Sequence, residues 1–253
     1  MSSSFSVIMP IHNEEDWLPL SLPSVYKLKP SEVILFFDRC TDKSIKVAQS
    51  LAKSHGMLEK TRLVNVHADV DGFTMRFAYM RWLACMHCRT DIVLITGADL
   101  ILDRKISTYI TLLNDKVRFV NFSYLDYPVN PRNLLKRLMT KIFPMIGGER
   151  WLSGVHAFFK SAMFECENLE ELKTLEGAQD THIHKAIQKR YLTTYVNTNT
   201  KHLRPKESGA RHYFRGTLYW RSAKRGFFIT LLSALSMFRL NLIKGYIHER
   251  YGK

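Results

Sequence analysis

Residues 5–15 of the chain read FSVIMPIHNEE, and this stretch sets a pattern that the following hundred residues repeat. Its first seven residues are apolar and rich in β-formers, which predicts a buried strand. The polar residues come next, and Asn13 is a candidate cap for a helix that places Glu14, Glu15 and Asp16 at its positive end. We therefore expect a strand that ends in a polar loop and leads into a helix.

The same alternation continues along the chain. Further strands are expected at 32–37, 62–67 and 91–96, and helices at 43–55 and 72–87. Strands that alternate with helices at this spacing indicate an α/β fold with a mostly parallel sheet and helices on both faces. Ligands of such sheets bind beyond the carboxyl ends of the strands. The first candidates for a site are therefore the polar residues after each strand, namely His12, Asn13, Glu14, Asp38, the stretch 67–71 and Asp99.

Beyond residue 103 the pattern is less regular. Strands are expected at 116–124 and within 151–160, and a helix is expected at 181–189, directly after Asp180. Residues 198–211 are polar and are predicted to form a loop. Cysteine usage adds no site, because Cys85 and Cys88 lie in a predicted helix without a second pair to complete a zinc centre. We interpret both cysteines as packing residues.

The charge of the chain is concentrated at its C-terminal end. The net charge is +14, and residues 189–253 contain 14 Lys and Arg against only Glu207 and Glu249. A segment this basic indicates an anionic partner, which could be a lipid surface, a phosphate-bearing substrate or nucleic acid. No recognisable nucleic-acid reader motif accompanies it, so nucleic acid is not expected.

Residues 213–253 are predicted to form a basic amphipathic helical tail. Aromatic, apolar and basic residues mix there at helical spacing, which is typical of a helix on a membrane surface or of one packed on a domain core. The longest apolar run, near 227–238, is shorter than the roughly 20 residues that span a bilayer. With no signal peptide or disulfide framework in view, we expect a cytoplasmic protein, peripheral at the cytoplasmic membrane face.

Several motifs together resemble a known family. They are the stretch 7–15, the Asp-x-x-Thr-Asp segment at 38–42, Gly72 with Arg76, Gly97-Ala98-Asp99, Ser153-Gly154, and Gly177-Ala178-Gln179-Asp180. In this order and spacing they resemble glycosyltransferase family 2, whose members have the GT-A fold and transfer a sugar from a nucleotide-diphosphate donor with inversion. The resemblance covers most of residues 5–190.

The resemblance implies a role for each matching residue. The donor-binding residues would be Pro10, His12, Glu14, Asp38, Arg76 and Ala98. The Gln-x-x-Arg-Trp motif that the family has further along is absent from this chain. Arg211 and Arg215 lie at a comparable place, and they could reinforce the clamp on the diphosphate. Asp99 would hold a divalent metal, Mn²⁺ or Mg²⁺, although Gly97 replaces the first Asp of the family's metal motif. His212 is a second candidate metal ligand.

The acceptor side of the predicted site rests on Ser153, Gly154 and Asp180. An attacking hydroxyl must lose a proton, so inverting transfer requires a general base near the acceptor. The resemblance assigns that base to Asp180, with Gln179 in place of the family's usual Glu. Because Asp180 precedes a predicted helix, an N-cap is the alternative.

The predicted organisation is a GT-A domain over 1–212, followed by the tail. Its nucleotide-binding half spans about 1–103 and its acceptor-binding half about 104–212. The expected partners are a UDP- or GDP-sugar donor, a glycan or lipid-linked acceptor, and an anionic membrane surface. A sugar nucleotidyltransferase is the alternative enzyme, although no glycine-rich loop follows the first strand. A basic membrane-binding adaptor is the alternative without catalysis.

Overall fold

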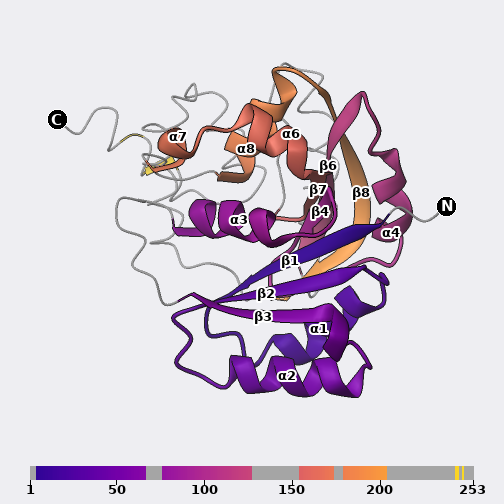
Figure 1. Cartoon of the computed structure of the whole chain (residues 1–253), viewed down its shortest axis with the longest axis vertical. Helices are drawn as coiled ribbons and strands as arrows, with labels where there is room; N and C mark the ends of the chain where they lie inside the picture. Colours follow the sequence, from indigo (N-terminus) through magenta and orange to yellow (C-terminus); the bar gives the residue numbers. More distant parts are fainter. Residues whose placement is uncertain are drawn as a thin grey trace. The chain divides into compact units, whose positions relative to one another are not determined.

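The computed structural model describes residues 4–66, 76–126, 154–173 and 179–203, together with positions 243, 244 and 247 (Figure 1). Nearly all of these residues belong to one compact unit, and the description that follows is of that unit. The stretch 127–153 lies outside the described residues, as does the predicted tail apart from positions 243, 244 and 247.

The described strands form one eight-stranded sheet in the order β3-β2-β1-β4-β7-β6-β8-β5. The first half is parallel, because β1 pairs with both β2 and β4, and β2 pairs with β3. The second half begins where β7 pairs antiparallel with β4 and β6. The strands are β1 (Phe5–Ile11), β2 (Glu32–Asp38), β3 (Thr61–Val66), β4 (Ile92–Ile95), β5 (Leu100–Ile101), β6 (Val117–Asp126), β7 (His156–Phe159) and β8 (Leu192–His202).

Helices cover both faces of the sheet, as the α/β pattern predicts. The described helices are α1 (Leu18–Tyr26), α2 (Ser44–Ser54), α3 (Arg76–His87), α4 (Ile106–Tyr109), α6 (Lys160–Cys166), α7 (Leu169–Lys173) and α8 (Gln179–Gln188). In Figure 1 α1 and α2 lie on the opposite side of the parallel strands from α3. None of the described helices combines the length and the apolar character that crossing a membrane requires.

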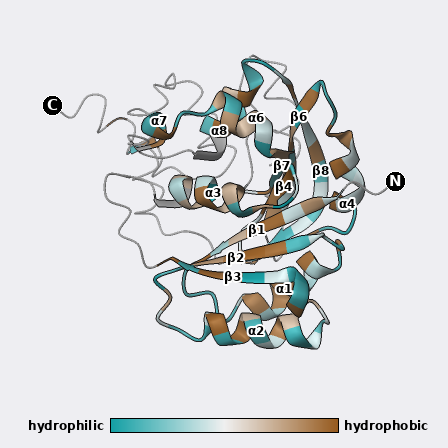
Figure 2. Ribbon diagram, viewed as in Figure 1, coloured by the Kyte–Doolittle hydropathy of each residue, from teal (hydrophilic) through white to brown (hydrophobic). Residues whose placement is uncertain are grey.

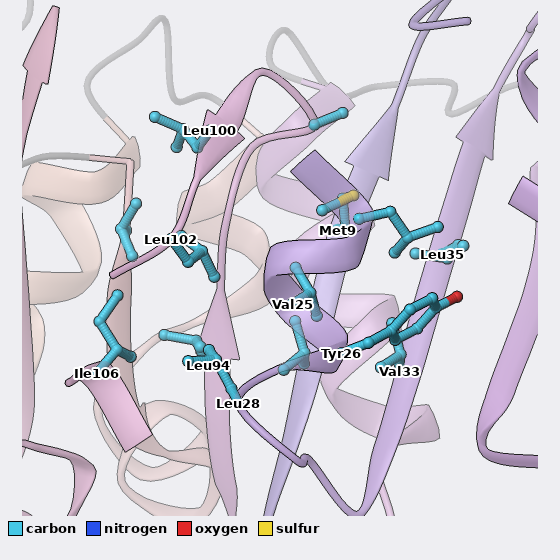
Figure 3. Close-up of a cluster of buried hydrophobic side chains, with 14 of the residues drawn as sticks. Met9, Val25, Tyr26, Leu28, Val33, Leu35, Leu94, Leu100, Leu102 and Ile106 are labelled. Carbon is cyan, nitrogen blue, oxygen red and sulfur yellow. The ribbon is translucent and has the colours of Figure 1, made fainter. Parts of the chain in front are cut away.

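Alternation along the central strands divides the core into two clusters. On β1, Val7 and Met9 belong to the cluster under α1 and α2, whereas Ile8 belongs to the cluster under α3, α6 and α8. Successive strand residues point to opposite faces of a sheet, so a strand that is buried on both faces must be apolar at every position. Figure 3 shows the first cluster, in which Met9 and Leu35 of the strands lie near Val25 of α1.

The structure confirms the strands and helices expected in the first hundred residues, with small shifts at their ends. β1 matches its prediction, and β2, α2, β3 and β4 begin or end within two residues of theirs. The predicted helix over 72–87 is described from Arg76 onward. The α/β fold class is therefore confirmed, with parallel pairing found among β1 to β4.

The loop predicted at 198–211 is wrong in its first part, because β8 continues to His202. Thr198 and Thr200 are buried despite their polarity. The Thr198 hydroxyl donates a hydrogen bond to the Ser123 carbonyl at 2.6 Å, and the Ser123 hydroxyl accepts one from the Thr198 amide at 2.9 Å. Hydroxyls that are hydrogen-bonded in this way can be buried in a sheet at little cost. Figure 2 accordingly shows fewer hydrophobic positions on β8 than on β1.

The four cysteines are free thiols, and Cys85, in α3, and Cys88, directly after it, are buried. Burial, with the nearby Glu32 charge adding to it, raises the pKa of Cys88 to about 12. Burial also raises the pKa of Cys40, Cys85 and Cys166 above the ordinary thiol value. Cys85 and Cys88 therefore act as packing residues.

Candidate active site

The parallel strands bring their carboxyl ends, and the polar residues that follow them, to one edge of the sheet. The register aligns Ile11 of β1 with Phe37 of β2, and Ile8 of β1 with Ile95 of β4. His12, Asp38 and the segment 97–99 therefore follow neighbouring strands at the same edge. This is the edge at which open α/β sheets bind their ligands.

His12 and Asp38 meet directly at this edge. The His12 Nδ1 lies 2.6 Å from the Asp38 carbonyl oxygen. A carbonyl can only accept, so Nδ1 carries the hydrogen in this contact. The Asp38 carboxylate is 12% exposed and lies 3.1 Å from the guanidinium of Arg39. The His12 ring is thus held by the backbone of Asp38, and the carboxylate of the same residue is held by Arg39.

Two loops beneath this pair are joined by hydrogen bonds between side chains and backbone. The loop after β1 and the loop after β2 exchange them in both directions. Asn13 Oδ1 accepts from Thr41 N at 2.8 Å, and Glu15 Oε2 accepts from Lys43 N at 2.7 Å. In return, Asp42 Oδ2 accepts from Glu15 N at 3.0 Å.

Asn13 is therefore not the helix cap that its position after the strand predicts. α1 begins at Leu18, several residues later, and its first turn contains no acidic residue. Asn13 instead adopts a left-handed conformation with φ of 54°, which Asn tolerates better than most residues, and its carboxamide reaches the neighbouring loop. A local sequence pattern cannot reveal a hydrogen-bond partner 28 residues away.

Asp42 bonds to the backbone at the start of α2, where Lys43 is the N-cap residue and makes no side-chain cap bond. Asp42 Oδ1 accepts from the Ser44 amide at 3.0 Å. Partial burial raises the pKa of the Asp42 carboxyl, but hydrogen bonds from Ser44 and Glu15 outweigh it and leave the pKa below its ordinary value. The Asp42 carboxylate is therefore charged near neutral pH, and the loop it supports is held in place.

Asp99 pairs with a histidine that the sequence did not single out. Its Oδ2 lies 3.2 Å from the Nε2 of His202, and the two side chains are 15% and 25% exposed. β5 pairs with β8 so that Leu100 lies opposite His202, and the Asp99 carbonyl accepts a hydrogen bond from Leu203 N at 2.9 Å. The Tyr124 ring lies 5.0 Å from the His202 ring, between centroids.

Gly97 leaves the room that the Asp99 carboxylate occupies. A Cβ atom at position 97 would lie 2.7 Å from Asp99 Oδ1, closer than real Cβ contacts come. Any side chain at this position would therefore push the carboxylate aside. The Asp99 carboxylate can therefore take its present position because residue 97 is Gly and not the Asp of the family's metal motif.

The other predicted donor residues are placed as follows. Pro10 is the one partly exposed residue of β1, opposite Phe36. Glu14 is buried, and its amide donates to Ser44 Oγ at 2.8 Å. Ala98 is buried in the core cluster under α1, so its backbone alone is left to face a ligand. Arg76 is the first described residue of α3.

On the acceptor side, Gly154 lies two residues before β7, and a Cβ built on it meets no atom of the described residues within 4 Å. Asp180 lies within the first turn of α8, so the idea that it precedes the helix as its N-cap is wrong. The remaining predicted residues, Ser153, Arg211, His212 and Arg215, lie outside the described residues.

The residue that sequence reasoning missed is His202. It falls in the stretch taken for a loop, whereas Thr, Tyr and Val between 192 and 200 are the β-formers that could have indicated a strand.

Over the described parts of the chain, no cluster of three or more His, Cys, Asp or Glu side chains is arranged to hold a metal. Among the described residues Asp99 and His202 thus form a pair, and a metal bound there would need further ligands from elsewhere in the chain, from a substrate or from water.

Comparison with known proteins agrees with this geometry. The chain belongs to glycosyl transferase family 2, whose model matches residues 6–172. It is therefore a glycosyltransferase, and neither the nucleotidyltransferase nor the adaptor alternative fits this membership. No curated protein matches the chain significantly.

Solved structures show the same fold at low sequence identity. The chain resembles S. aureus TarS 1–349 with a TM-score of 0.58 and 13% identity, covering 99% of this chain and 72% of that one. It resembles glucosyl-3-phosphoglycerate synthase from Mycobacterium tuberculosis, solved with Mn²⁺, UDP and phosphoglyceric acid, with a TM-score of 0.51 and 18% identity, covering 80% and 72%. A further structure of that synthase, with Mn²⁺ and UDP-glucose, has a TM-score of 0.54 and 16% identity, covering 87% and 79%. The GT-A fold expected from the motifs is confirmed.

Replacing Asn13 should separate the two contributions that this residue makes to the loop. Asn13→Gly loses the hydrogen bond to Thr41 and should lower the free energy of unfolding by about 1 kcal/mol. Asn13→Ala loses the same bond but keeps a Cβ in the left-handed region without the amide that lets Asn tolerate it, so it should be less stable than Asn13→Gly by roughly 1–2 kcal/mol. Urea denaturation of both variants measures the gap.

Lys29 is the matched control, because its φ of 56° is similar and its side chain is exposed. Lys29→Ala should be less stable than Lys29→Gly by a similar margin. If Asn13→Ala were as stable as Asn13→Gly, the left-handed conformation at Asn13 would be wrong.

Proposed function

We propose that the chain transfers a sugar from a nucleoside diphosphate donor to an acceptor hydroxyl or a lipid phosphate, with inversion and with the help of a divalent metal. The observation that carries this proposal is the contact between Asp99 and His202, at the sheet edge that also holds His12 and Asp38. Family membership supplies the reaction class, and the contact supplies a place for the metal and the diphosphate.

The Asp99 and His202 side chains suit a divalent cation. Two ligands that bind one octahedral ion at right angles, each about 2.1 Å from it, lie about 3 Å apart. The 3.2 Å between Asp99 Oδ2 and His202 Nε2 matches this spacing. A carboxylate with an imidazole favours Mn²⁺ over Mg²⁺, which prefers oxygen ligands. The synthase structures that resemble this chain contain Mn²⁺ with UDP, which supports the same choice.

A divalent metal bound by this pair would stabilise the negative charge that develops on the departing diphosphate. Asp38 would accept hydrogen bonds from the ribose or the base, and His12 Nε2 would add an acceptor. Pro10, Glu14, Arg76 and the backbone at Ala98 would complete the donor site from the same edge. We also propose that Arg211 and Arg215 contact the diphosphate and that His212 binds the metal.

Asp180 would act as the general base. The acceptor oxygen attacks the anomeric carbon, its proton passes to the Asp180 carboxylate, and the bond from that carbon to the phosphate oxygen breaks, so the bonding electrons leave with the nucleoside diphosphate. Attack opposite the leaving group inverts the anomeric centre. Asp180 is the second residue of α8.

Ser153 and Gly154 would admit the acceptor beside the base. A lipid-linked acceptor would agree with the basic residues of 213–253, which we propose to hold the enzyme at an anionic membrane surface.

Calorimetric titration with UDP-, GDP- and dTDP-sugars, with and without Mn²⁺, tests the donor site. We expect one nucleotide class to bind in a metal-dependent manner, and Asp99→Ala and His202→Ala each to weaken that binding by about tenfold or more, equivalent to about 1.4 kcal/mol. Asp115→Ala is the control, because this exposed carboxylate pairs with Arg118 on the surface. If no nucleotide sugar bound at any metal concentration, the proposed function would be wrong.

Asp180→Asn should leave that binding intact and lower turnover by about 10²- to 10⁴-fold, because an amide cannot take the proton. Release of nucleoside diphosphate, with water as the acceptor, measures turnover. Turnover at the wild-type rate would remove Asp180 from its proposed role while leaving the donor site in place.

Gly97→Asp tests the coupling between Gly97 and the metal pair. Although it adds a carboxylate, we expect it to weaken Mn²⁺ binding by about tenfold, because its Cβ must displace the Asp99 carboxylate. Mn²⁺ affinity is measured from the electron paramagnetic resonance signal of the free ion. Gly56→Ala is the control, since it strains a left-handed residue (φ 64°) without touching Asp99. Tighter Mn²⁺ binding by Gly97→Asp would contradict the prediction.

A further inference from the structure

A buried ion pair lies between α3 and the segment after α6. The Arg81 and Glu167 side chains are both 0% exposed. One guanidinium nitrogen of Arg81, Nη2, donates to both carboxylate oxygens of Glu167, at 2.6 and 2.7 Å. Burying two charges costs several kcal/mol per ion, and a close, well-hydrogen-bonded pair at best offsets that cost. Apolar packing would often stabilise the fold as well, so the pair invites a role other than stability.

The same carboxylate also holds a residue of α8. Glu167 Oε1 lies 3.1 Å from His182 Nδ1, and His182 is the fourth residue of that helix. His182 Nε2 lies 4.0 Å from the exposed carboxylate of Glu171. Arg81, Glu167 and His182 thus form a chain of contacts, here called the buried triad, which joins α3 to the first turn of α8.

The two helices that the buried triad joins begin with residues of the proposed mechanism. α3 begins at Arg76, proposed to approach the diphosphate, five residues before Arg81. Asp180, the proposed base, lies two residues before His182 in the same helical turn. Each turn of a helix is fixed by hydrogen bonds to the next, so holding His182 also holds the backbone of Asp180.

We propose that Glu167 and His182 are positioning residues, which fix the first turn of α8 so that Asp180 is correctly placed to take the acceptor's proton. Arg81 fixes Glu167 in turn. This proposal rests on the proposed function, because it gives the triad a purpose through Asp180. Misplacing a catalytic group by about 1 Å can lower turnover by about 10²-fold. A hydrogen bond that does not touch the substrate can therefore change the rate strongly.

His182 is the residue to replace, because it is one-quarter exposed and its loss leaves the Arg81–Glu167 pair intact. His182→Ala removes the contact with Glu167. His182→Asn restores it, since the amide nitrogen of Asn stands where Nδ1 stands in His. The matched control is His184→Ala, on the same helix, whose Nε2 lies 2.9 Å from Thr193 Oγ1 and outside the triad.

Two measurements on the full chain are needed. Hydrogen exchange of the amides of residues 183–186, whose helical hydrogen bonds run to the carbonyls of residues 179–182, reports how firmly the first turn of α8 is held. Steady-state kinetics, with Mn²⁺ and whichever of the UDP-, GDP- or dTDP-sugars binds, separates kcat from KM. For His182→Ala we expect exchange at 183–186 to be about tenfold faster, and kcat to fall about 10- to 100-fold at an unchanged KM for the donor. His182→Asn should recover both to within about threefold of wild type, and His184→Ala should change neither.

The outcomes separate this proposal from the one on which it rests. If Asp180→Asn abolished turnover while His182→Ala kept the wild-type kcat, the proposed function would stand and the positioning role would be overturned. If Asp180→Asn turned over normally, the base assignment would fail and the positioning role with it. A loss in His182→Ala that His182→Asn did not recover, or that appeared as a raised KM, would indicate a general packing defect and would also overturn the proposal.

Discussion

Parallel pairing of β1 with both of its neighbours is the constraint on which the rest of the structure depends. A strand with partners on both edges and helices on both faces must be apolar at nearly every position, and Val7, Ile8 and Met9 meet that demand. Parallel strands end at the same edge, so His12, Asp38 and Asp99 meet there without any motif that links them in sequence. The hydrophobic core thereby positions the polar site.

The antiparallel half of the sheet supplies the partner of Asp99 in the candidate site. Asp99 comes from the end of β4, but its partner His202 comes from β8, about a hundred residues later, and the pairing of β5 with β8 brings the two together. The buried triad similarly connects α3, which packs on the parallel strands, with α8, which follows the antiparallel ones. These polar contacts add to the β4–β7 pairing and to the two apolar clusters, which join the parallel and antiparallel parts of the sheet.

The sequence was informative where the signal is local and apolar. The strands β1, β2 and β4 could be predicted because continuous runs of Val, Ile, Leu and Phe have few other uses, and Asp38 and Asp99 followed from the ends of those runs. β8 could be predicted only in part, because its polar threonines resemble loop residues in the sequence. They are buried because their hydroxyls form hydrogen bonds, that of Thr198 with the Ser123 carbonyl and that of Thr200 with Thr198. Asn13 and His202 depend on partners far along the chain, and Arg81 and Glu167 belong to residue types that usually lie on the surface. Burial of that kind is a property of the tertiary structure.

The raised pKa values of the cysteine thiols affect how readily the protein reacts with oxidants and alkylating agents. Only the thiolate reacts readily with oxidants and alkylating agents. Burial raises the pKa of Cys88 to about 12, so its thiol is protonated near neutral pH. The pKa values of the other three cysteines are also raised. Thiol-directed reagents should therefore react with these four cysteines more slowly than with an ordinary exposed thiol.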